Sequence, residues 1–136
     1  MKKTIKLLAL TLVLVMTVVM LASCGGPNAD PDKAVDALEE NDYLAGEDKL
    51  IIPTALKALG VKGIKSVVTG LGEGEDDSIE AITIIYFDDK DAANDAWEKV
   101  EDYANKNKED GAKDWVVKKS GAMIYYGTPA AVKAAK

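Results

Sequence analysis

The chain has 136 residues, room for one targeting segment and one compact domain but not for two domains. Its formal net charge is −6 and its cations are all lysine, so without arginine a nucleic-acid partner is not expected. It has no histidine, and so lacks the commonest metal ligand and the side chain best suited to proton transfer near neutral pH.

The first 24 residues have the layout of an export signal. Residues 1–6 are cationic, residues 7–20 are almost entirely apolar, and Leu21-Ala22-Ser23-Cys24 follows. A retained transmembrane helix is the alternative, because the uncharged stretch is close to the shortest that spans a bilayer. That alternative does not explain why the only cysteine stands here, directly before Gly25-Gly26-Pro27.

The sequence Leu21-Ala22-Ser23-Cys24 resembles the lipobox of bacterial lipoprotein precursors. The resemblance implies cleavage between Ser23 and Cys24 and lipid attachment to the Cys24 thiol. We therefore expect a signal peptide over 1–23, a lipidated N-terminus and short flexible tether over 24–30, and a single domain over 31–136. The predicted location is the extracytoplasmic face of the cell membrane, and loss of the three leader lysines takes the charge to −9.

Helix-start signals mark the beginning of the domain. Asp30-Pro31 predicts a helix to about Asn41, with Asp30 as the N-cap and proline in the first turn. Pro53 predicts a second, short helix that ends near Gly60. The stretch between them is ambiguous, and 49–52 is the candidate for a short edge strand.

β-branched and aromatic residues predict the next two elements. Strands are expected over Ile64–Leu71 and Ile79–Phe87, joined by an open hairpin loop over 72–77. Because 81–87 is apolar almost throughout, the second strand is expected to be central in its sheet.

A helix is predicted from about Lys90 to Asn107, because apolar residues recur at helical spacing along it. Trp115–Lys119 and Met123–Tyr126 follow as strands joined by a tight Ser120-Gly121 turn. Thr128-Pro129 then predicts a last helix over 130–135.

The predicted order is α-α-β-β-α-β-β-α, in which helix–strand–strand occurs twice without a residue-level match between the two units. Hairpins require antiparallel pairing, and helices must bury the apolar side of the sheet. We therefore predict an α+β two-layer sandwich, with a mainly antiparallel sheet of four to five strands and helices on one face.

Four short stretches of the domain resemble a group of small uncharacterised lipoproteins of Gram-positive bacteria. They are Ile84-Ile85-Tyr86-Phe87-Asp88-Asp89-Lys90-Asp91-Ala92, Ser120-Gly121, Tyr125-Tyr126-Gly127-Thr128 and Ala131-Val132-Lys133-Ala134-Ala135. They mark a strand end, a helix cap and a turn, and the resemblance implies no established activity.

Two acidic clusters are candidates for a cation site. Carboxylates gather at Glu73, Glu75, Asp76 and Asp77, but their spacing departs from that of calcium loops, so a solvated hairpin tip is the favoured interpretation. The second cluster, of Asp88, Asp89 and Asp91, is interpreted as helix capping, with Asp88 and Asp91 in a capping box.

Other candidate sites are weaker. Gly70, Gly72 and Gly74 lack the following helix and lysine of a phosphate loop, so turn roles are favoured. Ser120 and Thr128 have no histidine to activate them as nucleophiles, although Lys118 or Lys119 is a conceivable base for Ser120. No catalytic, cofactor or metal residue is therefore assigned.

Aromatic residues are the best candidates for recognition. Trp97 lies on the apolar stripe of its helix and is assigned to the core, whereas Trp115 is left open. Tyr125 and Tyr126 are consecutive strand residues, so they point to opposite faces and one of them is expected to be exposed. That tyrosine is the candidate for a binding surface.

The predicted function is that of a non-enzymatic binding or interaction module, anchored to the membrane through Cys24, with an unidentified envelope protein or ligand as its partner. An accessory or inhibitory subunit of a membrane or envelope complex is the alternative. An enzyme that uses carboxylates alone is the least favoured.

Overall fold

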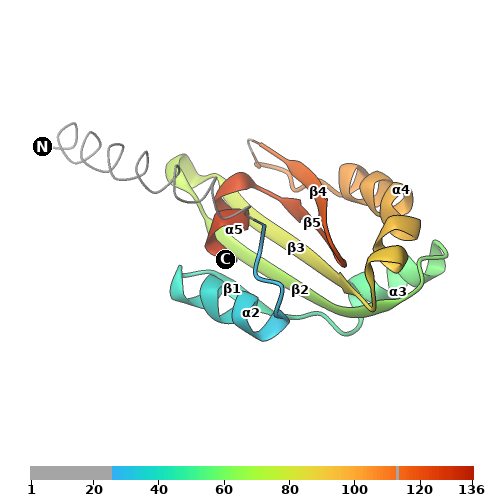
Figure 1. The fold of residues 1–136 in the computed structure, drawn as a ribbon. Helices are drawn as coiled ribbons and strands as arrows, with labels where there is room; N and C mark the ends of the chain where they lie inside the picture. The colour runs from blue at the N-terminus through green and yellow to red at the C-terminus, as the bar shows by residue number, and fades with distance from the viewer. Residues whose placement is uncertain (1–25, 113) are drawn as a thin grey trace, which may run out of the picture.

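The computed structural model describes residues 26–112 and 114–136. They form one five-stranded sheet and four α-helices (Figure 1). In chain order the elements are α2 (Pro31–Glu40), β1 (Leu44–Glu47), α3 (Ile51–Ala58), β2 (Ile64–Glu73), a 3₁₀ turn (Glu75–Asp77), β3 (Ile79–Phe87), α4 (Lys90–Lys106), β4 (Val116–Ser120), β5 (Met123–Gly127) and α5 (Pro129–Ala134).

The sheet is antiparallel throughout, with the strand order β1-β2-β3-β5-β4. β2 and β3 form the long hairpin, and β4 and β5 form a second hairpin that pairs through β5 with β3. The predicted α+β class, antiparallel sheet and order of elements are confirmed.

The helices cover both faces of the sheet, and the prediction of helices on one face was wrong. One core contains residues of α3 and α4 together with Val67, Ile85 and Ile124. The other core contains residues of α2 and α5 together with Val68 and Ile84. Neighbouring residues of one strand thus enter different cores, since side chains alternate across a sheet. The fold has three layers: α2 with α5, the sheet, and α3 with α4. In Figure 1, α2 and α5 lie on the left and α3 and α4 on the right.

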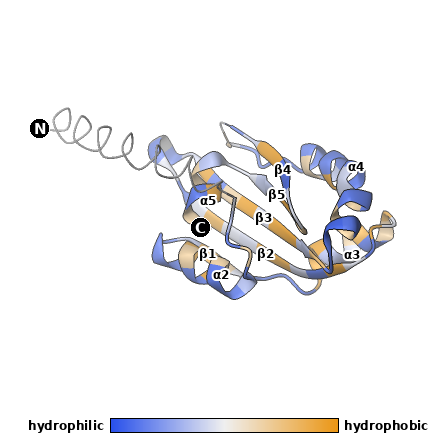
Figure 2. Ribbon diagram, in the orientation of Figure 1, coloured by the Kyte–Doolittle hydropathy of each residue, from blue (hydrophilic) through white to orange (hydrophobic). Residues whose placement is uncertain are grey.

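The physical reason lies in β3. All of its residues from Ala81 to Phe87 are buried, so both faces of this strand must be covered. In an antiparallel sheet with one face in solvent, apolar and polar residues alternate along each strand. The continuous apolar run of β3 departs from this alternation and is typical of a strand that is buried on both faces. Figure 2 shows that hydrophobic colour continues along β3, while α4 is mostly hydrophilic on its outer side.

The edge strand lies earlier than predicted. β1 is Leu44–Glu47, while Ile51 and Ile52 belong to the first turn of α3 instead of to a strand over 49–52. Asp48 explains this difference, because its carboxylate accepts hydrogen bonds from the backbone N–H groups of Leu50, Ile51 and Ile52, each 2.9 Å long. A side chain that takes up the free N–H groups of a first turn favours the helix over an extended chain.

Candidate functional site

Cys24 and Ser23, the predicted lipid-attachment and cleavage residues, lie outside the described residues. The segment that follows them is not the free tether that we expected. Pro27 is buried, and the Asn28 backbone N–H donates to the Ala135 carbonyl at 2.8 Å. The Tyr86 hydroxyl donates to the Asn28 carbonyl at 2.7 Å. Residues 26–30 therefore belong to the packed domain, because contacts with the C-terminal residues and with β3 hold them.

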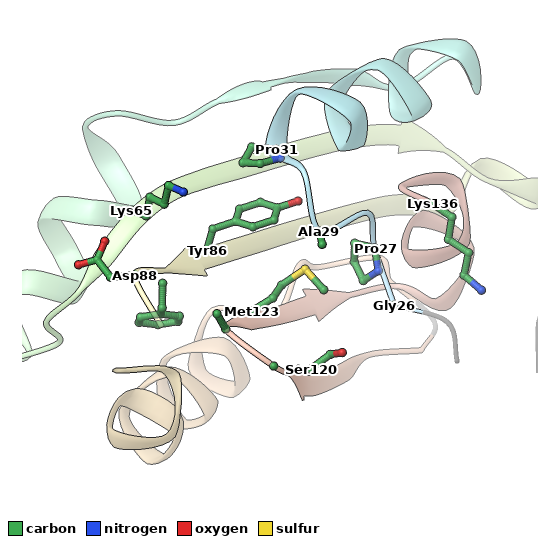
Figure 3. A pocket seen from close by; sticks show the side chains of 13 residues that line it. Gly26, Pro27, Ala29, Pro31, Lys65, Tyr86, Asp88, Ser120, Met123 and Lys136 are labelled. Carbon is green, nitrogen blue, oxygen red and sulfur yellow. The ribbon is translucent and has the colours of Figure 1, made fainter. Parts of the chain in front are cut away.

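A cavity of about 730 Å³ lies beside this segment (Figure 3). Pro27 and Ala29 form one wall, and Lys65, Asp88 and Ser120 are among its polar lining residues. The Tyr86 side chain points towards the segment in Figure 3, in agreement with its hydrogen bond to Asn28. The cavity thus lies between the N-terminal segment and the sheet.

The two nucleophile candidates have structural roles. Ser120 is exposed at the end of β4, directly before the turn residue Gly121. Thr128 is buried, and its Oγ1 accepts a hydrogen bond from the Ala81 backbone N–H at 3.2 Å. Thr128 is the N-cap residue of α5, but its side chain makes no capping hydrogen bond. Its hydroxyl joins α5 to β3 instead.

The acidic hairpin loop forms a 3₁₀ turn over Glu75–Asp77. Within residues 26–112 and 114–136, no group of three acidic, cysteine or histidine residues has the arrangement of a metal site. Glu73, Glu75 and Glu80 instead line a cavity of about 730 Å³ together with Tyr43. Burial, with a smaller contribution from Glu80, raises the pKa of the Tyr43 hydroxyl.

Gly70 and Gly72 leave room for side chains of the α2/α5 face. A Cβ on Gly70 would lie 2.9 Å from Leu38 Cδ1, and one on Gly72 would lie 2.9 Å from Tyr43 Cδ2. Both glycines are within β2, so the loop that we expected to begin at residue 72 begins later. Their role is close packing, which the spacing of the glycines alone did not indicate.

The second acidic cluster begins α4, as predicted, but with a different cap. Asp89 is the N-cap residue, and its carboxylate accepts a hydrogen bond from the Ala92 backbone N–H at 2.8 Å. The predicted capping box from Asp88 to Asp91 is therefore wrong: the N-cap lies one residue later, and Ala92 at the third helical position has no polar side chain to return the bond. The Asp88 backbone N–H donates instead to the Gly63 carbonyl at 2.8 Å.

Tyr125 and Tyr126 point to opposite faces, as predicted, but neither is exposed. Each is 4% exposed, Tyr125 in the α2/α5 core and Tyr126 in the α3/α4 core. Burial raises the pKa of both hydroxyls, that of Tyr126 to about 12 against the opposing effect of a hydrogen bond from Thr83. The expectation of one exposed tyrosine failed because helices cover both faces.

A groove on the α3/α4 face brings together residues that sequence reasoning did not connect. Its volume is about 360 Å³, within the range of about 300–1,000 Å³ that is usual for ligand pockets. Its lining comes from the sheet, from α3 and α4, and from the segment between α4 and β4. The lining residues include Leu44, Ile52, Thr69, Leu71, Thr83, Tyr103, Asn107, Glu109, Trp115 and Tyr126. We call this site the α3/α4 groove.

The floor of the α3/α4 groove follows one row of paired residues across the sheet. Gly46 is paired with Thr69, Thr69 with Thr83, and Thr83 with Tyr126. The Trp115 ring lies beside the Tyr126 ring, with centroids 6.0 Å apart and planes inclined at 44°. The floor is thus polar at Thr69 of β2 and Thr83 of β3 and aromatic at Tyr126 of β5.

One polar atom of the groove residues has no partner. The Trp115 Nε1 is buried and makes no hydrogen bond within the described part of the chain. A buried N–H without an acceptor costs about 1–3 kcal/mol, and because this atom is buried, a ligand acceptor would reach it only after the indole ring moves.

The mouth of the groove is apolar. Leu44 and Leu71 are paired across β1 and β2 and are 79% and 47% exposed. Leu50, Ile51 and Leu59 of the α3 region are exposed as well. Of these residues, Leu44 and Leu71 line the groove, and exposed apolar side chains at a cleft are typical of a surface that contacts a ligand or another protein.

Comparison with other proteins does not assign a function to the chain. No known protein family, curated protein or solved structure matches it. Across residues 26–112 and 114–136, no helix has the length and apolar character needed to cross a membrane.

Proposed function

We propose that this chain is an extracytoplasmic lipoprotein, held on the cell membrane through lipid on Cys24, and that its α3/α4 groove binds an apolar ligand or a segment of an envelope protein. The sequence Leu21-Ala22-Ser23-Cys24, with its cationic and apolar leader, supports the lipid anchor. The resemblance of the domain to small lipoproteins of Gram-positive bacteria agrees with that location.

The observation that carries the binding role is the combination of an apolar mouth with an unpartnered polar atom. Leu44 and Leu71 expose apolar surface at the groove, and covering that surface would contribute about 25 cal/mol per Å². The Trp115 side chain is in the same lining, and a movement of its ring would let the buried indole N–H gain a hydrogen bond from an acceptor such as a carbonyl oxygen.

The position of the N-terminal segment supports an accessible groove. A Cβ on Gly26 would lie 3.2 Å from the ring of Tyr125, which belongs to the α2/α5 core. Tyr126, the next residue, lines the groove on the other face. Since the sheet lies between them, a lipid on Cys24 would hold the α2/α5 face towards the membrane and leave the groove open to partners.

An accessory or inhibitory subunit of an envelope complex is the second candidate. The exposed Leu50, Ile51 and Leu59 favour it, because they add exposed apolar surface in the α3 region outside the groove lining. In this case the partner is a folded protein surface. An enzymatic role has the least support, because catalysis by carboxylates needs a raised pKa in a cleft, whereas the pKa of Asp48 is lowered.

Site-specific photo-cross-linking in living cells tests the binding role. A photoreactive phenylalanine analogue at Leu71 is expected to give discrete adducts, while the same analogue at the exposed Lys33 of α2 is the control on the other face. The same adducts at both positions, or none at Leu71, would contradict the proposed groove. Mass spectrometry of the cell-derived chain tests the anchor, since Cys24→Ala is expected to abolish acylation and cleavage.

A further inference from the structure

The two edges of the sheet differ in how they are protected. β4 forms one edge and carries Lys118 and Lys119, both exposed. Charged residues, lysine above all, are a common protection of an edge strand against pairing with another strand. β1 forms the other edge, and its sequence Leu44-Ala45-Gly46-Glu47 contains no cation. The β1 edge also borders the α3/α4 groove.

The register of β1 identifies the backbone groups that face outward. The Asp48 N–H donates to the Val67 carbonyl at 2.8 Å, so the groups of residue 48 point towards β2. Backbone groups alternate in direction along a strand, and the pairing of β1 with β2 has no register shift. The N–H and C=O groups of Ala45 and Glu47 therefore point away from the sheet.

These outward groups are not used elsewhere in the described chain. Ala45 and Glu47 make no backbone hydrogen bond with turns, loops or caps of residues 26–112 and 114–136. The space above Gly46 is open, with no atom within 4 Å of the position of a Cβ. A further strand beside β1 would place its side chains next to Gly46 and the exposed Leu44, at the mouth of the groove.

Charge narrows the choice of occupant. Glu47 on the edge strand and Glu109 in the groove lining are exposed. Lys49 Nζ lies 3.9 Å from the Glu47 carboxylate and offsets part of its charge, but the whole chain carries a net charge of −6. A second copy of this chain would bring the same negative charge to the interface, which opposes self-pairing. A segment with lysine or arginine residues would instead be attracted.

We propose that β1 receives an extended segment of a partner protein as a sixth, edge strand, and that this segment alternates apolar and cationic residues. Its apolar side chains enter the α3/α4 groove beside Leu44 and Leu71, and its backbone pairs with Ala45 and Glu47. Main-chain pairing supplies affinity in this mode of recognition, and alternate side chains supply specificity. The proposal rests on the proposed function, because it takes the groove as the binding site.

Ala45→Pro is the critical variant. It removes one outward N–H but no hydrogen bond to β2, and proline is tolerated on the outer side of an edge strand. Ala45→Ser keeps the N–H and is the matched control. Leu71→Asp, at the groove mouth, tests the groove independently of the edge.

The probe is a capped peptide of alternating leucine and lysine, titrated against the full lipidated chain in nanodiscs. We expect saturable binding that slows amide hydrogen exchange at Ala45 and Glu47, and a Kd at least about tenfold higher in Ala45→Pro than in Ala45→Ser. A peptide that alternates leucine and glutamate is expected to bind more weakly.

The outcomes separate the two proposals. Binding that Leu71→Asp abolishes and Ala45→Pro leaves unchanged would overturn strand addition and keep the groove. Binding that neither variant changes, without protection at Ala45 and Glu47, would overturn strand addition and leave the groove to the cross-linking experiment. Absence of saturable binding by the leucine–lysine peptide would also overturn the proposed recognition of an alternating cationic segment.

Discussion

Trp115 and Tyr126 pack against each other in the α3/α4 groove, with ring centroids 6.0 Å apart. Tyr126 comes from β5, which lies inside the sheet, whereas Trp115 directly precedes the edge strand β4. The buried tyrosine thus supports a tryptophan that only partly belongs to the core. Tilted aromatic pairs of this kind contribute about 0.5–1.5 kcal/mol beyond the area that they bury.

Trp115→Phe tests whether the indole N–H is without a partner in the free protein. We expect a loss of no more than about 1 kcal/mol in the free energy of unfolding, because the smaller ring is offset by removal of an unsatisfied buried donor. Trp115→Ala, which removes the ring, is expected to cost about 2 kcal/mol or more. Urea unfolding of both variants gives the comparison. Equal losses for phenylalanine and alanine would contradict this expectation.

Asp48 is expected to make α3 sensitive to acid. Partial burial alone raises its pKa, but the backbone N–H groups of Ile52, Leu50 and Ile51 outweigh this effect and hold the pKa below its ordinary value. A lowered folded-state pKa means that the stabilisation is present above the unfolded-state pKa and is lost as the pH falls through the folded-state value.

Asp48→Asn removes the charge and one strong acceptor, and Asp48→Ala removes both acceptors. At neutral pH we expect Asp48→Ala to cost about 1 kcal/mol, as for other helix-capping residues, and Asp48→Asn to cost less. Both variants are expected to lose less stability than the wild type on acidification from neutral pH to about pH 3. Thermal unfolding over that range measures the effect, and parallel pH profiles would contradict it.

Tyr86→Phe is expected to loosen the N-terminal segment. It removes the hydroxyl that donates to the Asn28 carbonyl, at a cost of about 1 kcal/mol. Amide hydrogen exchange at Asn28 should accelerate, because its N–H bond to Ala135 loses this neighbouring support. Tyr43→Phe, which removes a hydroxyl from a tyrosine packed against the same core, is the control, and equal acceleration in both variants would argue against a specific role for Tyr86.

Much of the fold follows from local patterns. The β-branched run from Ile79 to Phe87 predicts β3 with its observed bounds, and the apolar stripe predicts α4 to within one residue. The helix repeats its apolar spacing over several turns, and the strand keeps its β-branched and apolar character along its whole length. The local preference of each segment therefore agrees with its place in the folded domain. The sequence also contained a signal that helices cover both faces of the sheet, namely the continuous apolar run of β3. The run alone does not say whether one face of the strand is exposed to solvent, so it did not predict where the helices lie.

The candidate groove depends on contacts that no local pattern records. Leu44, Leu71, Tyr103, Trp115 and Tyr126 come from five separate parts of the chain and meet only after the sheet forms. The same holds for the N-terminal segment, where Asn28 contacts residues 135 and 136 across almost the whole domain. A binding role for aromatic residues stays a prediction, but the expectation of an exposed tyrosine was wrong, because helices cover Tyr125 on one face and Tyr126 on the other.

Gly127 is expected to be the least replaceable residue at the junction of β5 and α5. Its φ is +150°, a conformation that side chains rarely adopt, and an added Cβ would collide with the Ala81 carbonyl oxygen and lie 2.8 Å from Ile82 Cα. These are backbone atoms of the central strand, which cannot move aside without disturbing the sheet. The Thr128 N–H donates to the same Ala81 carbonyl at 2.8 Å, so a shift there would weaken the attachment of α5.

Gly127→Ala is therefore expected to lower the free energy of unfolding by about 3 kcal/mol or more, in the range that marks backbone strain and overpacking. Gly46→Ala is the control, because it lies in the same sheet with no atom within 4 Å of its added Cβ and is expected to be neutral or slightly stabilising. Urea unfolding of the two variants against the wild type measures the difference. A loss below about 1 kcal/mol for Gly127→Ala would mean that β5 can shift relative to β3.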